Sequence, residues 1–199
     1  MKKIVSGIAL LAAAGAVQAT QTYTDESAFQ AAIAPGFYLE DFDGYVYGGF
    51  TEETLTLADG GWQYTLSAYG DGSAGLWSGD GNMSTNSALN PITVEFDTPV
   101  SAVGGWFFSS DIDGFYIPGT VELERSDGTF LSFDPPDDIV FRGFTTYPST
   151  PFVSMTIDAI DDAFTNRWPT MDHFYVGDYI PAPSALALLG LGFVARRRR

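Results

Sequence analysis

Apolar and polar residues alternate along much of the chain, with the period of a half-buried β-strand. Ile92, Val94 and Phe96 alternate with polar neighbours, and Val121 and Leu123 do the same. The runs at residues 152–157 and 174–176 have a similar pattern. A period of two predicts short strands that each turn one face towards a core.

Turn motifs separate these predicted strands. The clearest is Ser126-Asp127-Gly128-Thr129, which lies between residues 121–125 and 130–133 and predicts a β-hairpin. The others are Asp59-Gly60-Gly61, Asp71-Gly72, Asp80-Gly81-Asn82 and Asp113-Gly114. About ten short strands with such frequent turns predict an all-β fold, an antiparallel β-sandwich, rather than βαβ units. Residues 69–90 are rich in Gly, Ser and Asn, and we expect them to form the longest loop.

One short helix is predicted near residue 25. Thr24 is the expected N-cap, and Phe29, Ala32 and Ile33 have the spacing of an apolar helix face. Pro35-Gly36 is expected to end the helix.

The first 19 residues have the pattern of a secretory signal peptide. Two lysines precede an apolar run at residues 4–17, and Val17-Gln18-Ala19 is a small-x-small cleavage site. Cleavage after Ala19 makes Thr20 the first residue of the mature protein. A buried N-terminal helix or an uncleaved anchor are the alternatives, although the run is short and weakly apolar for a core ~30 Å thick.

The last 20 residues combine three features in a fixed order. Pro181-Ala182-Pro183 is followed by an apolar run at residues 185–195 and then by four basic residues. These are Arg196, Arg197, Arg198 and Arg199. The run is shorter than the ~20 residues of a permanent span, and the positive-inside rule places the arginines in the cytoplasm.

This tail resembles the PEP-CTERM sorting signal. The resemblance implies that an exosortase-type membrane protease cuts near the Pro-x-Pro motif after a transient stay in the inner membrane. Ala182 replaces the usual Glu of the motif, which leaves the variant of the processing enzyme open. An ordinary tail anchor is the alternative. The expected organisation is a signal peptide at residues 1–19, one domain at residues 20–179 and a sorting tail at residues 180–199.

Charge is distributed very unevenly along the chain. Residues 20–179 contain all 25 acidic residues but only three arginines, a formal net charge of −22. Nucleic acid and anionic membrane surfaces are poor partners for such a field, whereas cations, neutral glycans and basic proteins remain compatible. A solvated acidic surface suited to saline surroundings explains the charge equally well. The absence of cysteine excludes disulfides and thiol catalysis.

Residues 91–177 resemble the ectodomains that commonly precede this tail. The resemblance is carried by Val103-Gly104-Gly105-Trp106-Phe107-Phe108 and by Met171-Asp172-His173-Phe174-Tyr175-Val176-Gly177, together with residues 92–96 and 141–144. It implies a jelly-roll-like sandwich related to carbohydrate-binding modules. Such modules often hold a structural calcium ion, and Phe42-Asp43 and Met171-Asp172 occupy the corresponding places. In a jelly roll the first and last strands can pair, which would bring the segment of Asp41 and Asp43 towards Asp172, so these three aspartates are the calcium candidates. The alternative is that turn aspartates only cap backbone amides.

Exposed aromatic side chains are candidates for glycan binding. Tyr45, Tyr47, Trp77 and Trp168 stand in Gly-rich or polar surroundings, whereas Trp62 and Trp106 lie in strand-like runs and are expected in the core. Core packing is the alternative for each of the four candidates as well.

No nucleophile or metalloprotease motif accompanies the single histidine, His173. A lone histidine in a terminal strand is more often structural than catalytic, so we expect a structural role for His173. The sequence therefore predicts a non-catalytic surface or matrix protein, exported and then associated with exopolysaccharide. A carbohydrate-binding module with a defined ligand and a secreted polysaccharide-degrading enzyme are the competing hypotheses. The expected partners are the secretion machinery, signal peptidase, an exosortase-type protease and exopolysaccharide, with no nucleic acid.

Overall fold

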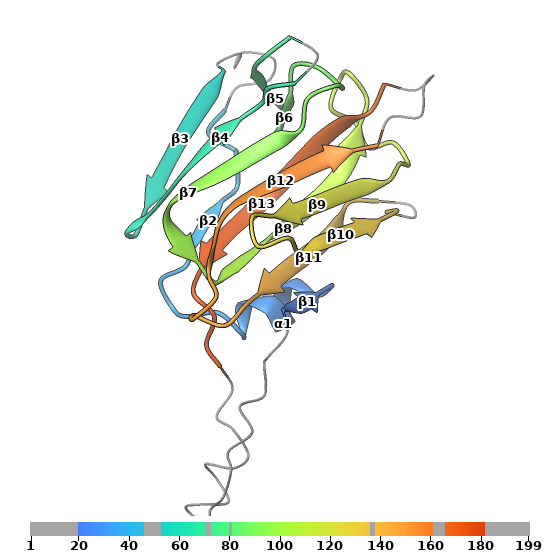
Figure 1. The fold of residues 1–199 in the computed structure, drawn as a ribbon. Helices are drawn as coiled ribbons and strands as arrows, with labels where there is room; N and C mark the ends of the chain where they lie inside the picture. Colours follow the sequence, from blue (N-terminus) through green and yellow to red (C-terminus); the bar gives the residue numbers. More distant parts are fainter. Residues whose placement is uncertain are drawn as a thin grey trace, which may run out of the picture.

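The chain forms two antiparallel β-sheets that pack face to face, as the alternating pattern predicts (Figure 1). A computed structural model describes residues 20–45, 53–70, 73–79, 81–135, 138–160 and 166–181. Both apolar ends of the chain, for which helices were expected, lie outside these residues.

The first sheet has seven strands in the described chain. Their order is β1 (Gln21–Tyr23), β11 (Val140–Thr145), β8 (Ala102–Ser110), β13 (Trp168–Gly177), β6 (Asn82–Thr85) and β5 (Leu76–Gly79), and β2 (Tyr38–Glu40) also pairs with β13. β6 pairs with β13 at Met171, and β2 pairs with it at residues 174–176. The two short strands therefore border different halves of β13.

The second sheet has six strands in the described chain. Their order is β10 (Phe130–Phe133), β9 (Val121–Arg125), β12 (Phe152–Ala159), β7 (Ile92–Val100), β4 (Trp62–Ser67) and β3 (Thr54–Asp59). The predicted hairpin is confirmed, because β9 and β10 pair from Val121↔Phe133 to Glu124↔Phe130. Gly128 has φ 81°, which is a left-handed conformation that glycine adopts without strain.

Aromatic residues fill the core between the sheets. The Phe174 ring of the first sheet lies 5.4 Å from the Tyr64 ring of the second and 6.5 Å from that of Phe107. Ile92, Val94 and Phe96 of β7 belong to the same buried cluster. The alternation in the sequence thus correctly identified the face of β7 that is buried.

A five-residue helix, α1 (Glu26–Gln30), packs on the outer face of the first sheet. The predicted cap was wrong: Asp25 is the N-cap, and its Oδ1 accepts a hydrogen bond from the Ala28 amide at 2.7 Å. Phe29 is fully buried. An added Cβ would lie 2.5 Å from the Phe29 ring at Gly143 and 2.9 Å from it at Gly104, so these glycines make room for the helix.

The segment after α1 is hydrogen-bonded to the last residues of the described chain. The helix ends at Gln30, before the predicted Pro35-Gly36 stop. The Ala34 amide donates to the Asp178 carbonyl at 2.7 Å, and the Ile180 amide donates to the Ala32 carbonyl at 2.9 Å. These bonds place the end of the described chain beside α1, whereas β5 and β6 lie at the opposite end of the sandwich (Figure 1).

Residues 69–90 are not simply a loop, because they contain the hairpin of β5 and β6. Leu76 and Met83 of this hairpin face the core. The small residues Ser78, Gly79 and Ser84 are buried as well. Apolar and polar positions therefore do not alternate clearly, and the strands were missed.

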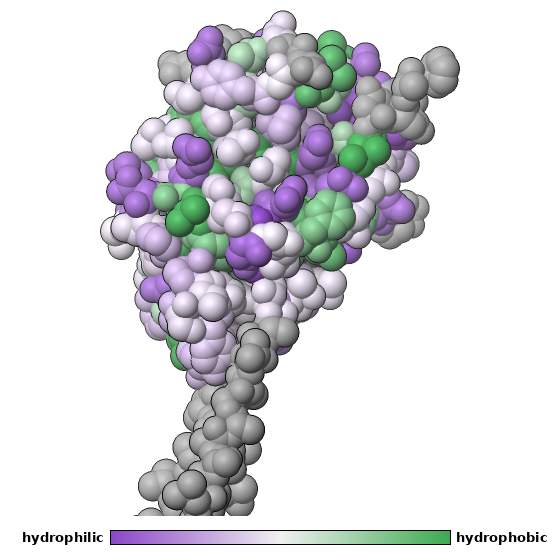
Figure 2. Space-filling view, in the orientation of Figure 1, coloured by the Kyte–Doolittle hydropathy of each residue, from purple (hydrophilic) through white to green (hydrophobic). Residues whose placement is uncertain are grey.

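The visible surface mixes hydrophilic and hydrophobic residues, and no apolar area extends over a whole sheet in this view (Figure 2). Within the described ranges, no helix is long and apolar enough to cross a membrane.

Candidate functional site

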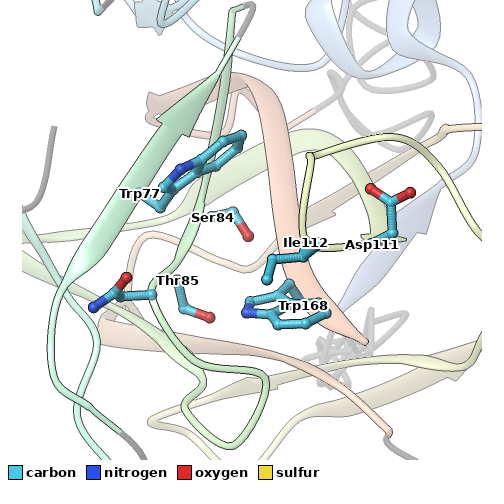
Figure 3. A pocket seen from close by; sticks show the side chains of 7 residues that line it. Trp77, Ser84, Thr85, Asp111, Ile112 and Trp168 are labelled. Carbon is cyan, nitrogen blue, oxygen red and sulfur yellow. The ribbon is translucent and has the colours of Figure 1, made fainter. Parts of the chain in front are cut away.

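Two of the predicted glycan-binding residues, Trp77 and Trp168, line one pocket on the outer face of the first sheet (Figure 3). The pocket has a volume of about 150 Å³. Its lining consists of Trp77, Ser84, Thr85, Asn86, Asp111, Ile112 and Trp168. Figure 3 shows the two indole rings on opposite sides of the hollow, with Ser84 between them.

Strand pairing explains why these residues meet. Trp77 of β5 is directly opposite Ser84 of β6, so both side chains point to the same face. Trp168 begins β13 and is opposite Ser110 of β8. Met83 and Met171 pair with each other and face the core, which leaves Ser84 and Trp168 on the outer face.

Two glycines fix the position of the Trp77 ring. An added Cβ at Gly79 would lie 2.3 Å from Cη2 of Trp77, and one at Gly114 would lie 2.9 Å from the same atom. Gly114 has φ 87° and closes the Asp113-Gly114 turn. Any larger side chain at either position would displace the ring from the pocket wall.

The turn that carries Ile112 is held by Asp111. Oδ1 of Asp111 accepts hydrogen bonds from the amides of Asp113 and Phe115, both at 3.0 Å. This aspartate therefore caps backbone amides, as the alternative to metal binding proposed. The turn presents Ile112 beside Trp168 (Figure 3), and Ile112 is 72% exposed.

A chain of buried hydroxyl groups lies beneath the pocket. The hydroxyls of Ser110 and Thr170 are 2.7 Å apart, Thr170 donates to Oγ of Ser84 at 3.1 Å, and Ser84 donates to the Pro169 carbonyl at 2.9 Å. Because these partners satisfy one another, the base is rigid. Two indole faces over a polar base can hold a ligand that has both an apolar face and hydroxyl groups.

The other two predicted glycan-binding residues are not part of this pocket. Tyr45 is half-buried and packs against Phe42, with ring centroids 6.4 Å apart. Burial and the nearby Glu40 raise the pKa of Tyr45. Tyr47 lies outside the described residues. Trp62 and Trp106, predicted in the core, are half-buried in β4 and β8 and pack against the two core clusters.

The three predicted calcium ligands come from segments that approach each other. β2 pairs with β13, which brings the segment of Asp41 and Asp43 towards Asp172. Burial raises the pKa of Asp172, and the charge of Asp43 adds to the rise. However, Oδ1 of Asp41 accepts the Asp43 amide at 3.1 Å, and the described residues contain no group of three His, Asp or Glu that could hold a metal ion. Calcium stays a prediction from the sequence.

A second, open cleft of about 470 Å³ lies on the same face beside α1. Its lining consists of Glu26, Leu39, Trp106, Ile139, Asp172, His173 and Tyr175. The register of β13 with β8 shifts between Asp172 and Tyr175, and His173 has φ 48°. This irregularity brings Nδ1 of His173 to 2.7 Å from Oδ1 of Asp172.

The hydroxyl of Tyr175 belongs to a hydrogen-bonded group in this cleft. It donates to Glu26 and accepts from Nε2 of Gln30 at 2.9 Å. Burial raises the pKa of Tyr175 to about 12, and the bond to Glu26 adds to this effect.

The raised pKa of Tyr175 leads us to expect a loss of stability at alkaline pH. Its pKa in the folded chain lies above the ordinary value of 10.0. The stabilisation by the neutral phenol is therefore complete below about pH 10 and is lost as the pH rises towards 12. Urea unfolding across this interval should show a smaller loss for Tyr175→Phe than for the wild type. Tyr147→Phe, at a position outside this hydrogen-bonded group, should match the wild type. Equal losses in wild type and Tyr175→Phe would contradict the assignment.

Two of the predicted processing residues are described. The hydroxyl of Thr20 accepts a hydrogen bond from Nη2 of Arg125 at 2.9 Å, and Pro181 is exposed. Ala19, Ala182, Pro183 and the four terminal arginines lie outside the described residues.

No family model matches this chain, and neither a curated protein nor a solved structure does. The polar pocket residues at positions 84–86 were not identified from the sequence. The second cleft was not predicted as a site either, although its Asp172 was named as a candidate calcium ligand. The Asp80-Gly81-Asn82 turn signal could have revealed the β5–β6 hairpin and with it the pairing of Trp77 with Ser84.

Proposed function

We propose that this chain is an exported, non-catalytic surface or matrix protein that binds exopolysaccharide in the pocket between Trp77 and Trp168. The observation that carries this proposal is the position of the two indole rings on opposite sides of one hollow. Sugar rings combine an apolar C–H face with hydroxyl groups at their edge. An aromatic wall with polar groups at the base and rim suits both parts.

The size of the pocket fits part of a chain rather than a whole ligand. At about 150 Å³ it is smaller than the ~300–1,000 Å³ of pockets that enclose small molecules. A single ring or the end of a polysaccharide is therefore the proposed occupant. The side chain of Asn86 is exposed at the rim and can bond sugar hydroxyls.

The arrangement of the domain supports a role at the surface. β13 begins at Trp168 in the pocket and ends at Gly177, and ten residues of strand extend roughly 33 Å. The described chain ends at Pro181 beside α1, at the other end of the sandwich, where the predicted sorting tail begins. A chain attached through that tail would direct the pocket away from the membrane.

The proposed route begins with the secretion machinery and signal peptidase, which remove residues 1–19. An exosortase-type protease then cuts near Pro181, after transient attachment to the inner membrane. The neighbouring Ile180 is 45% exposed, which is compatible with access by a protease. The mature protein would then lie at the cell surface or outside the cell.

A glycan array followed by calorimetry on the purified full-length chain tests the binding site. Trp77→Leu and Trp168→Leu should each weaken binding of the selected glycan about tenfold or more, because each removes one aromatic wall. Phe130→Leu changes an exposed aromatic residue on the second sheet and should leave the affinity unchanged. Unaltered affinity in both tryptophan variants would contradict the site, and release of reducing sugar ends by the wild type would contradict a non-catalytic function.

A further inference from the structure

The second cleft differs chemically from the tryptophan pocket. It is three times as large, and it combines a tryptophan with two carboxylates and a histidine. The hydrogen bonds described above hold both carboxylates in place: Asp172 is bonded to His173, and Glu26 is bonded to Tyr175. A ligand would therefore meet fixed acceptors rather than mobile side chains.

Trp106 supplies an aromatic wall in this cleft. Its ring stands in a T-shaped contact with Phe141, with centroids 6.0 Å apart, and it is only half-buried. Leu39, which is 38% exposed, contributes a further apolar surface. The exposed parts of these side chains can support the C–H face of a sugar.

The charge of the cleft selects its ligand. None of the residues that line it is Lys or Arg. The three arginines of the domain lie elsewhere. Arg125 is buried at the end of β9 in the second sheet, Arg142 lies over the Phe133 ring at 4.4 Å, and Arg167 lines a different pocket. His173, which is bonded to Asp172, is the one basic residue of the lining, so no Lys or Arg side chain of the lining pairs with either carboxylate. The formal charge of −22 on residues 20–179 attracts cations.

We propose that the cleft formed by Glu26, Trp106 and Asp172 binds an amino sugar whose amino group is free and protonated. The ammonium group would contact the carboxylates, and the ring would lie against the indole, where cation–π attraction adds to the contact. This inference rests on the proposed glycan-binding function and names the class of glycan.

One glycan chain can reach both sites. Trp168 and Asp172 lie on the same face of β13, four positions apart along the strand, which corresponds to roughly 13 Å. An oligosaccharide of a few rings spans this distance. The tryptophan pocket would then bind any ring of suitable shape, whereas the cleft would distinguish free amines from acetylated ones.

Calorimetry on the full-length chain in detergent, in slightly acidic buffer, tests the proposal with two probes. These are a glucosamine hexamer and an N-acetylglucosamine hexamer. The glucosamine hexamer should bind about tenfold more tightly. Asp172→Asn should remove this preference while keeping the size of the side chain, and Trp106→Leu should weaken binding of both probes. Asp97→Asn alters an exposed carboxylate of the second sheet and should preserve the preference.

Equal affinities of the wild type for the two hexamers would overturn the amino-sugar assignment. So would tighter binding of a lysine hexamer, because the cleft would then respond to charge alone. If Trp168→Leu still weakens binding in either case, the proposed glycan-binding function survives. If neither hexamer binds and the glycan array is also negative, both proposals fail.

Discussion

Arg125→Ala should lower the free energy of unfolding by about 3–5 kcal/mol. Arg125 is 2% exposed and forms an ion pair with Asp127. Its guanidinium carbon lies 4.5 Å from the centre of the Phe152 ring and 5.4 Å from that of Phe144. Truncation would leave a cavity between these rings and remove the hydrogen bonds to Thr20 and Thr129, each 2.9 Å long.

Arg125→Met separates the two contributions. Methionine preserves most of the volume between the rings but cannot form the ion pair or the hydrogen bonds, so the expected loss is about half that of alanine. Urea unfolding followed by circular dichroism measures both variants. A loss below about 1 kcal/mol for Arg125→Ala would show that the buried guanidinium does not stabilise the sandwich.

The ion pair also has a defined dependence on pH. Partial burial raises the pKa of Asp127, but the hydrogen bonds from Arg125 and Thr129 outweigh this effect and lower it below the ordinary value of 3.8. A lowered pKa means that the stabilisation is present above that value and is lost as the pH falls through the lower, folded-state pKa. Arg125→Met should therefore flatten the acid side of the stability curve.

The sequence predicts the sandwich because local patterns determine most of it. The alternation at residues 92–96 and the Asp127-Gly128 turn depend only on near neighbours, and both are confirmed in β7 and the β9–β10 hairpin. The hairpin of β5 and β6 was missed because its buried positions include Ser78 and Ser84, which have no apolar signal. When positions on both faces of a strand are buried, and small polar residues occupy some of them, apolar and polar residues no longer alternate in the sequence.

The candidate sites are predictable only in part, because they depend on which strands become neighbours. Trp77 and Trp168 were both chosen from their polar surroundings, but they stand 91 positions apart in the chain. They meet because β6 lies between β5 and β13. Local patterns do not determine that order, and they do not reveal the register shift that brings His173 to Asp172 either.

The attachment of α1 to the first sheet leads to the second large effect. Phe29→Ala should lower the free energy of unfolding by about 3–5 kcal/mol, because a fully buried ring is removed. That ring lies 5.6 Å from the ring of Tyr23, 5.5 Å from Phe141 and 6.0 Å from Tyr175. Nothing else in the helix is buried, so α1 should loosen locally before the sandwich unfolds.

Hydrogen exchange at the Ile180 amide reports this local loosening. The amide donates to the Ala32 carbonyl just after α1, so release of the helix should expose it while the amides of β7 stay protected. Phe29→Leu keeps most of the apolar contact and should cost less than about 1.5 kcal/mol with little change in exchange. If the Ile180 amide exchanges at the wild-type rate in Phe29→Ala, the helix does not hold the end of the domain. If it exchanges faster, the contacts of Phe29 also control how far the segment before the predicted processing site is exposed to a protease.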